Sequence, residues 1–130
     1  MPIQPDMIGM TVRDMAATLK FYRLLGLDIP EGAEKDDHVE YKSANGYRLA
    51  WDNVEMIKGL LPDWEEPRGH RMGLAFLVDS PAEVDAVHAR LTAAGYASRK
   101  DPWDAFWGQR YATVMDPDGN AVDVFAPLAS

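Results

Sequence analysis

The residues that decide the fold of this chain are 7–26, which read MIGMTVRDMAATLKFYRLLG. Residues 7–12 are typical of a strand, and the apolar side chains that follow recur at helical spacing. Asp14 stands where a helix N-cap is expected, and Gly26 supplies the C-terminal stop. The stretch therefore predicts a strand followed by an amphipathic helix.

The same order of elements returns about half a chain later. Residues 74–78 read LAFLV, a strand, and Ser80-Pro81-Ala82-Glu83 combines a capping box with proline at the first helical position. Gly95 would end this second helix. The two halves are offset by about 66 to 69 residues, as judged from the alignment of Val12 with Val78 and of Gly26 with Gly95. A single repetition indicates internal duplication and excludes a solenoid, which needs at least about three repeats.

Further strands follow each helix. In the first half, residues 38–41 and 47–51 flank Asn45-Gly46, a strong hairpin signal. In the second half, residues 110–115 and 121–125 flank a turn at 116–120. Each half therefore reads as β-α-β-β, with a further strand expected in each.

Between the halves, residues 54–69 predict a short helical turn and a proline-containing connector. We thus predict an α+β fold: one domain over 1–130, built from two tandem βαβββ modules at about 1–60 and 70–130. Together the modules are expected to form a curved mixed sheet.

Composition excludes several classes of function. The chain has 130 residues and no cysteine, so disulfides, thiolate catalysis and thiolate metal sites are ruled out. Its formal net charge of -8 would repel a phosphate backbone, which makes nucleic acid an unsuitable partner. Neither a membrane span nor a secretory signal is visible. We therefore expect a cytoplasmic protein with no membrane partner.

The paired modules carry two local motifs, Val12-Arg13-Asp14 before the first helix and Asp-Pro-Asp-Gly-Asn at 116–120 before the last strand. In this order they resemble the vicinal oxygen chelate superfamily, which includes glyoxalase I, extradiol dioxygenases, fosfomycin-resistance enzymes and bleomycin-resistance proteins. The resemblance covers essentially the whole chain. It implies the paired-module fold described above, in a homodimer.

Four segments resemble one branch of that superfamily more closely, the mitomycin-binding resistance proteins. They are residues 46–52, 69–71, 101–112 and 125–128. Proteins of this branch neutralise a drug by sequestering it, and they are not known as catalysts. The resemblance implies a homodimer whose paired modules enclose a cleft, with an aromatic sandwich around the ligand.

Metal-dependent members of the superfamily draw His, Gln or Glu ligands from equivalent strand positions of the two modules. Placed by the repeat, these positions fall here on Met7, Ala50, Gly73 and Asp123. Only Asp123 is a suitable ligand for a hard metal ion. His70 is three residues from Gly73, which would put its side chain on the opposite face of a strand. We therefore expect no metal cofactor and no metal-dependent catalysis.

Two tryptophans are candidate ligand contacts. Trp107 and Trp103 lie four residues apart with Phe106 beside Trp107, just before a predicted strand. They could floor an aromatic cleft, or they could pack in the core or at a dimer contact. The resemblance implies that Trp107 contacts the ligand, whereas Trp103 is expected mainly to support the loop.

Four further residues complete the predicted site. His38 could be an ordinary exposed histidine, but the resemblance implies that it stacks on the ligand opposite the tryptophan. Tyr47 and Trp51 are spaced to share one face of a strand, which could line either the cleft or the core. Arg110 could pair with Asp123 or a ligand carbonyl, or form a surface ion pair.

The predicted function is binding and sequestration of a planar aromatic or quinone-like small molecule, such as a mitomycin- or bleomycin-like antibiotic. One alternative is a metal-dependent lyase or dioxygenase of the same superfamily. Another is an accessory protein of natural-product biosynthesis.

Overall fold

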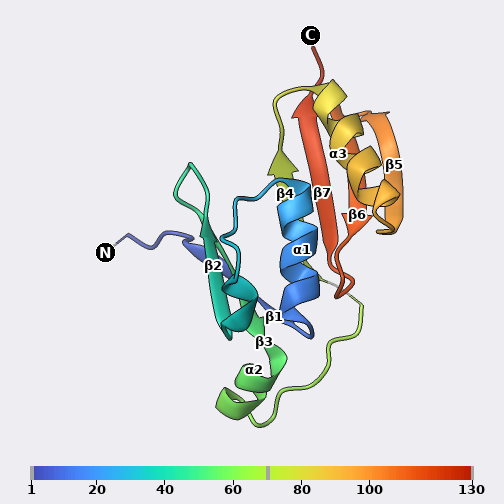
Figure 1. Cartoon of the computed structure of the whole chain (residues 1–130). Helices are drawn as coiled ribbons and strands as arrows, with labels where there is room; N and C mark the ends of the chain where they lie inside the picture. Colours follow the sequence, from blue (N-terminus) through green and yellow to red (C-terminus); the bar gives the residue numbers. More distant parts are fainter. Residues whose placement is uncertain (1, 70, 130) are drawn as a thin grey trace. The chain divides into compact units, whose positions relative to one another are not determined.

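The computed structural model describes residues 2–69 and 71–129. The chain divides into two compact units, Met1–Glu66 and Pro67–Ser130, which we call unit 1 and unit 2. Figure 1 labels their helices and strands. Among the described residues, no helix is long and apolar enough to span a membrane.

Unit 1 places one helix between its first and second strands. Its elements are β1 (Met7–Val12), α1 (Met15–Leu25), the 3-10 helix η1 (Ala33–Lys35), β2 (His38–Lys42), β3 (Arg48–Asn53) and α2 (Val54–Leu60). The sheet order is β1-β3-β2, with β1 parallel and β2 antiparallel to β3. The short helical turn predicted after the second hairpin strand is α2.

The ends of α1 are set by the two residues predicted from the sequence. The Asp14 carboxylate accepts a hydrogen bond from the Ala17 backbone N–H at 3.1 Å. Gly26 takes a φ of 132°, and its N–H donates to the carbonyls of Tyr22 and Arg23. These bonds satisfy backbone groups that a helix terminus leaves without intrahelical partners.

The two faces of the unit 1 sheet differ in character because side chains alternate along each strand. One face is core: Val39 and Trp51 are buried, and Trp51 packs against Tyr22 of α1 with ring centroids 5.0 Å apart. The opposite face carries His38 and Glu40 of β2, among other polar side chains. We call this second surface the polar face of unit 1.

Unit 1 has one strand fewer than expected. No strand forms between α1 and β2, although the structure describes every residue from 26 to 38. Pro30 and Gly32 (φ 87°) lie in this stretch, and the acidic run that follows contains η1. Proline lacks an N–H for a strand ladder and glycine favours turns, which explains the missing strand.

Unit 2 has the complete βαβββ order. Its elements are β4 (Gly73–Leu77), α3 (Pro81–Ala93), β5 (Ser98–Ala105), β6 (Gln109–Met115) and β7 (Ala121–Pro127). The sheet order is β4-β7-β6-β5, with β4 parallel to β7 and the other pairs antiparallel. The sequence predicted one further strand in this half without locating it, and the structure shows that this strand is β5.

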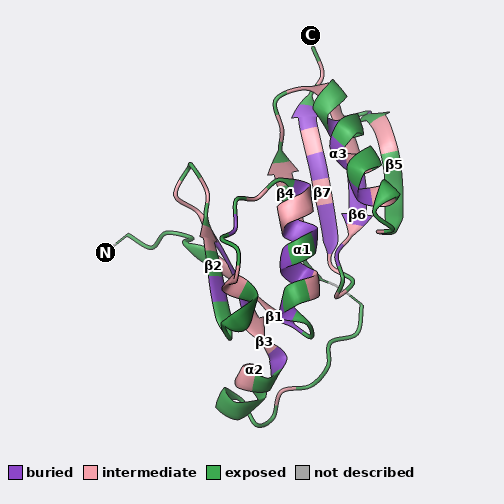
Figure 2. Cartoon of the chain, viewed as in Figure 1, coloured by how far each residue is buried: buried purple, intermediate pink, exposed green. Residues whose placement is uncertain are grey.

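Helix α3 covers one face of the unit 2 sheet, packing mainly on β6 and also on β5 and β7 (Figure 1). Ser80 caps its N-terminus by accepting from the Glu83 N–H, as predicted. Val84, Val87 and Leu91 of the helix are buried. Figure 2 shows that buried residues concentrate on β6 and β7, whereas much of β5 is exposed.

The hairpin between β6 and β7 is organised by Asp116. Its carboxylate accepts hydrogen bonds from the backbone N–H groups of Asp118 and Asn120 and from the Asn120 side-chain amide. Asp116 is buried, so these bonds replace the water that the carboxylate loses. The segment 116–120 is thus a turn held by one side chain.

The predicted α+β fold with two related modules is confirmed, and β1 and β4 begin 66 residues apart. Strands pair only within their own unit, so the described residues form two mixed sheets.

Candidate ligand-binding face

One row of side chains crosses all four strands of unit 2 on the face opposite α3. In register, Leu77 of β4 lies beside Phe125 of β7, Phe125 beside Tyr111 of β6, and Tyr111 beside Trp103 of β5. The Tyr111 and Phe125 rings are stacked, with centroids 5.9 Å apart and planes 23° apart. Apolar rings therefore cover this end of the sheet.

The turn between β5 and β6 adds two more rings. The centroid of the Trp107 ring lies 5.5 Å from that of Trp103 and 5.3 Å from that of Tyr111, both edge to face. The Phe106 and Trp107 centroids are 4.9 Å apart. Trp107 remains 48% exposed and Phe106 90% exposed. We call Trp103, Phe106, Trp107, Tyr111 and Phe125 the aromatic cluster.

The position of Trp107 is restrained by two local features. Its indole N–H donates to the Gln109 side-chain carbonyl at 2.7 Å. Gly108 has a φ of 94°, which only glycine adopts without strain, and its N–H closes the turn onto the Ala105 carbonyl. An exposed indole held in this way keeps its orientation, so a flat molecule could cover it with little reordering of the side chain.

A polar cross-strand pair, Thr113 and Asp123, lies next to the aromatic cluster on the same face. The hydroxyls of Tyr111 and Thr113 each donate to one Asp123 carboxylate oxygen, both at 2.7 Å. Burial raises the pKa of the Tyr111 hydroxyl to about 12, and its hydrogen bond to the Asp123 carboxylate contributes to the rise. Tyr111 therefore stays a neutral donor at physiological pH.

Beside this pair the face is hollowed, with a cavity of about 580 Å³. The residues lining it are Arg71, Met72, Gly73, Arg99, Lys100, Thr113, Ala121 and Asp123. Gly73 and Asp123, the two positions of this module considered as metal-ligand positions, thus lie on one hollow. We call it the basic hollow.

The residues at the four metal-ligand positions do not fit a divalent ion. Met7, which offers only a thioether, pairs with Arg48, and Ala50 pairs with Gly9 in the unit 1 sheet. In unit 2, Gly73 has no side chain, and both oxygens of Asp123 accept hydroxyl hydrogens. Within residues 2–69 and 71–129, no group of three His, Asp or Glu is arranged to hold a metal ion. His70 lies outside the described residues.

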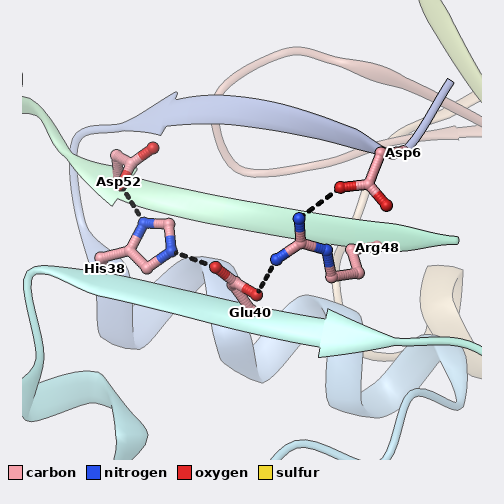
Figure 3. Close-up of polar contacts among 5 residues, drawn as sticks. All are labelled: Asp6, His38, Glu40, Arg48 and Asp52. Carbon is pink, nitrogen blue, oxygen red and sulfur yellow. Dashed lines mark hydrogen bonds and ion pairs between the residues drawn. The ribbon is translucent and has the colours of Figure 1, made fainter. Parts of the chain in front are cut away.

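His38 is part of a chain of charged groups on the polar face of unit 1 (Figure 3). Its Nε2 lies 2.7 Å from Glu40 and its Nδ1 lies 2.5 Å from Asp52. Arg48 then donates to Glu40 at 2.8 Å and to Asp6. Ionised carboxylates only accept, so both ring nitrogens of His38 donate when the imidazole is protonated.

The flanking carboxylates raise the pKa of His38 above its ordinary value of 6.5, chiefly through the hydrogen bond with Glu40 and then that with Asp52. In return, the hydrogen bond from His38 lowers the pKa of Glu40, with a further contribution from Arg48. The arrangement favours a cationic imidazolium on this face. His38 keeps part of its ring exposed, so a ligand could still contact it.

Trp51 and Tyr47 do not share one face of a strand, as the predicted cleft lining required. Trp51 is 0% exposed and packs against Tyr22, so its ring belongs to the core beneath α1. Its indole Nε1 is buried without a hydrogen-bond partner in the part of the chain that the structure describes. Tyr47 is in the hairpin turn before β3, where its N–H donates to the Asn45 side chain.

Arg110 also departs from the ligand-contact prediction. Its guanidinium pairs with Asp85 of α3 at 3.0 Å and with Asp104 of β5 at 3.1 Å. These contacts place it on the helix-covered face of the unit 2 sheet, away from Tyr111 and Thr113. The alternative of a surface ion pair describes it correctly.

The structure thus brings Trp103 and Trp107 together and adds residues that sequence reasoning missed. Tyr111 and Phe125 were missed as site residues. Alternation along β7 places Phe125 on the same face as Asp123, and Tyr111 shares that face because it pairs with Phe125. Glu40 and Asp52 were missed as His38 partners. Pairing β2 with β3 in register would have revealed Asp52, because it lies directly opposite His38.

Comparison with known proteins identifies the family of this chain. The family profile described as "Glyoxalase/Bleomycin resistance protein/Dioxygenase superfamily" matches residues 4–124. The chain therefore belongs to the glyoxalase/bleomycin resistance protein/dioxygenase superfamily. A search of curated proteins finds no match.

Solved structures share the fold over nearly the whole chain. A family enzyme from Burkholderia phytofirmans aligns with a TM-score of 0.83 at 21% identity, covering 97% of this chain and 100% of its own, which shows the fold alone. A glyoxalase-related enzyme from Fulvimarina pelagi aligns at 0.80 with 25% identity (95% and 87% covered). A protein from Agrobacterium tumefaciens aligns at 0.75 with 27% identity (98% and 100% covered).

Proposed function

We propose that this protein binds and sequesters a planar aromatic or quinone-like small molecule, without metal-dependent catalysis. The observation that carries the proposal is the aromatic cluster on the face of the unit 2 sheet opposite α3, with Trp107 48% exposed and Phe106 90% exposed. Large rings left in solvent at a restrained position favour a ligand that covers them.

The energetics of such a site suit a flat ligand. Each offset or edge-to-face aromatic contact contributes about 0.5–1.5 kcal/mol beyond the burial of its area. Trp107 contacts three other rings of the cluster, so its indole stays in place when a ligand arrives and little side-chain entropy is lost. Apolar contact with few directed polar groups is typical of binding pockets.

The biological form of the proposal is antibiotic resistance by sequestration, with a mitomycin- or bleomycin-like ligand. It follows the resemblance to the mitomycin-binding branch, which also suggests a homodimer and a second ring against the ligand from His38. The cytoplasmic location is proposed from composition, since the chain lacks cysteine. The bonds of His38 to Glu40 and Asp52 engage only its ring edge. This geometry is compatible with stacking on its exposed part.

The metal-dependent lyase or dioxygenase alternative has less support. Its ligand positions are Met7, Ala50, Gly73 and Asp123, which provide one carboxylate among them. A thioether suits soft metal ions, and a lone carboxylate does not hold a hard one. These four residues therefore do not support chemistry through a bound metal.

The test is calorimetric titration of the full chain with mitomycin C, bleomycin and a small set of planar quinones, with tryptophan fluorescence quenching in parallel. At least one compound should bind saturably. Trp107→Ala should weaken that binding by about 30-fold, a loss of about 2 kcal/mol typical of a central aromatic contact.

Trp51→Phe is the matched control, because it alters a tryptophan that is buried beneath α1. It should leave the dissociation constant within about two-fold, by the additivity expected of separated sites. Equal weakening by both variants would contradict a site at the aromatic cluster. Absence of binding to every compound would overturn the proposed function for these ligands.

A further inference from the structure

The basic hollow carries a charge opposite to that of the whole chain. Three cationic side chains line it, Arg71, Arg99 and Lys100, against the single carboxylate of Asp123. The whole chain has 21 acidic residues and only 13 basic ones. A concentration of cations in one cavity of an acidic protein indicates attraction for a negatively charged group.

The one carboxylate in the hollow is already supplied with donors. Both Asp123 oxygens accept hydroxyl hydrogens, from Tyr111 and Thr113. These two bonds stabilise its negative charge from the side of the sheet. Three cationic side chains thus line the hollow beside one carboxylate whose two oxygens already accept hydrogen bonds.

The basic hollow is continuous with the aromatic cluster. Lys100 places its Nζ 4.7 Å from the centroid of the Trp103 ring. Arg99 and Lys100 also line a second hollow of about 430 Å³, together with Ser98, Asp101, Pro102 and Trp103. Asp101 is the only carboxylate among the residues that line this second hollow.

The strand register fixes the spacing between the two surfaces. Thr113 and Asp123 form the cross-strand pair next to Tyr111 and Phe125 on the same face. Two residues along a strand span about 7 Å, roughly the width of a two-ring aromatic system. A single small molecule can therefore lie over the rings and reach the cations.

We propose that the ligand of this protein is an aromatic anion: its planar ring lies on the aromatic cluster, and a carboxylate, sulfonate or similar group enters the basic hollow. The inference deepens the proposed function and rests on it. Guanidinium groups such as those of Arg71 and Arg99 bind planar oxyanions through paired N–H donors. The cationic side chains of the hollow would favour anionic aromatic ligands over neutral ones, which stacking alone does not distinguish.

The test compares two probes of the same shape, anthraquinone-2-carboxylate and anthraquinone-2-carboxamide, titrated calorimetrically into the full chain at low and high salt. We expect the carboxylate to bind at least about ten-fold more tightly at low salt, because charge-assisted hydrogen bonds are the stronger kind. The difference should shrink as salt rises and screens the charges.

Substitutions locate the effect. Arg71→Gln and Arg99→Gln should each weaken carboxylate binding several-fold and leave carboxamide binding unchanged. Arg68→Gln removes the same charge from an exposed residue three positions before Arg71 that does not line the hollow, and it should change neither. Thermal unfolding of each variant checks that the fold is retained.

The outcomes separate this inference from the proposed function. If both probes bind with equal affinity and both lose it in Trp107→Ala, aromatic binding stands and the anionic preference is overturned. If Arg68→Gln weakens the carboxylate as much as Arg71→Gln does, the effect is one of net charge and the hollow is not the anion site. If neither probe binds, the proposed function fails for planar quinones and the inference fails with it.

Discussion

At the scale of single residues, the polar face of unit 1 shows how local environment sets the state of a side chain. A histidine at the start of a strand is ordinarily a group that titrates near pH 6.5. Here Glu40 and Asp52 approach its two ring nitrogens, and Arg48 and Asp6 continue the chain of charges. The imidazole is thereby held in one orientation, with its charge favoured.

This arrangement predicts how stability depends on pH. The pKa of His38 is raised in the folded state, so its contribution is full below pH 6.5 and is lost as pH rises through the folded pKa. The pKa of Glu40 is lowered from 4.5, so its contribution is full above pH 4.5 and is lost as pH falls through the folded pKa. The pair should therefore stabilise most between those two values.

NMR titration of the His38 ring protons measures the shift directly. The midpoint should lie above 6.5 in the natural chain and fall toward 6.5 in Glu40→Gln, because the largest cause of the shift is removed. A midpoint at or below 6.5 in the natural chain would show that the carboxylates do not hold the imidazolium.

At the scale of elements, capping residues explain why helices α1 and α3 begin where the sequence predicts. Asp14 and Ser80 each accept a backbone N–H three residues later, and each follows a strand by only a short connection. The local chemistry of such a cap needs no information from the rest of the fold. Helix starts were therefore predictable, whereas strand β5 was not located.

Replacing these caps should have a measurable cost. Asp14→Ala and Ser80→Ala should each lower the free energy of unfolding by about 1 kcal/mol, because one backbone N–H loses its acceptor. Asp14→Asn, which keeps an oxygen acceptor, should cost less than Asp14→Ala. Urea denaturation measures the difference, and equal stability of the alanine and asparagine variants would show that the hydrogen bond is not what holds the helix end.

The elements that escaped prediction share a physical feature. Strand β5 shows two register shifts against β6, near Lys100, and most of its residues are exposed. Such a strand lacks the alternation of apolar and polar residues on which sequence reading depends. The strand expected between α1 and β2 of unit 1 is absent for a different reason. Pro30 and Gly32 lie where the repeat predicted a paired strand.

At the scale of the whole molecule, the two units repeat one plan with different surfaces. The face of unit 2 opposite α3 is aromatic and basic, whereas the polar face of unit 1 carries alternating carboxylates and cations. The positions from which metal-dependent relatives draw ligands are spread over both units and supply one carboxylate, Asp123. At these four positions the chain thus supplies no complete donor set for a divalent ion.

Metal removal should accordingly have no effect. Dialysis against EDTA should leave the melting temperature and the affinity for an aromatic probe unchanged, and added Zn²⁺, Mn²⁺ or Ni²⁺ should raise neither. Differential scanning calorimetry and elemental analysis of the purified protein give the measurement. A stoichiometric metal whose loss abolishes probe binding would contradict the donor-set argument and revive the metal-dependent alternative.

The sequence by itself determined the duplicated plan, the helix limits and the hairpin turns. Each depends on neighbours a few residues away: caps, glycine stops, and the periods of helix and strand. Only the tertiary structure decided which face each side chain occupies. Trp51 is buried beneath α1 and Trp107 is 48% exposed, although the sequence left a cleft or a core position open for both. Arg110 pairs with Asp85 of α3. The side of a sheet that a helix covers is set by packing between residues far apart in the sequence. It therefore cannot be deduced from the spacing of neighbouring residues.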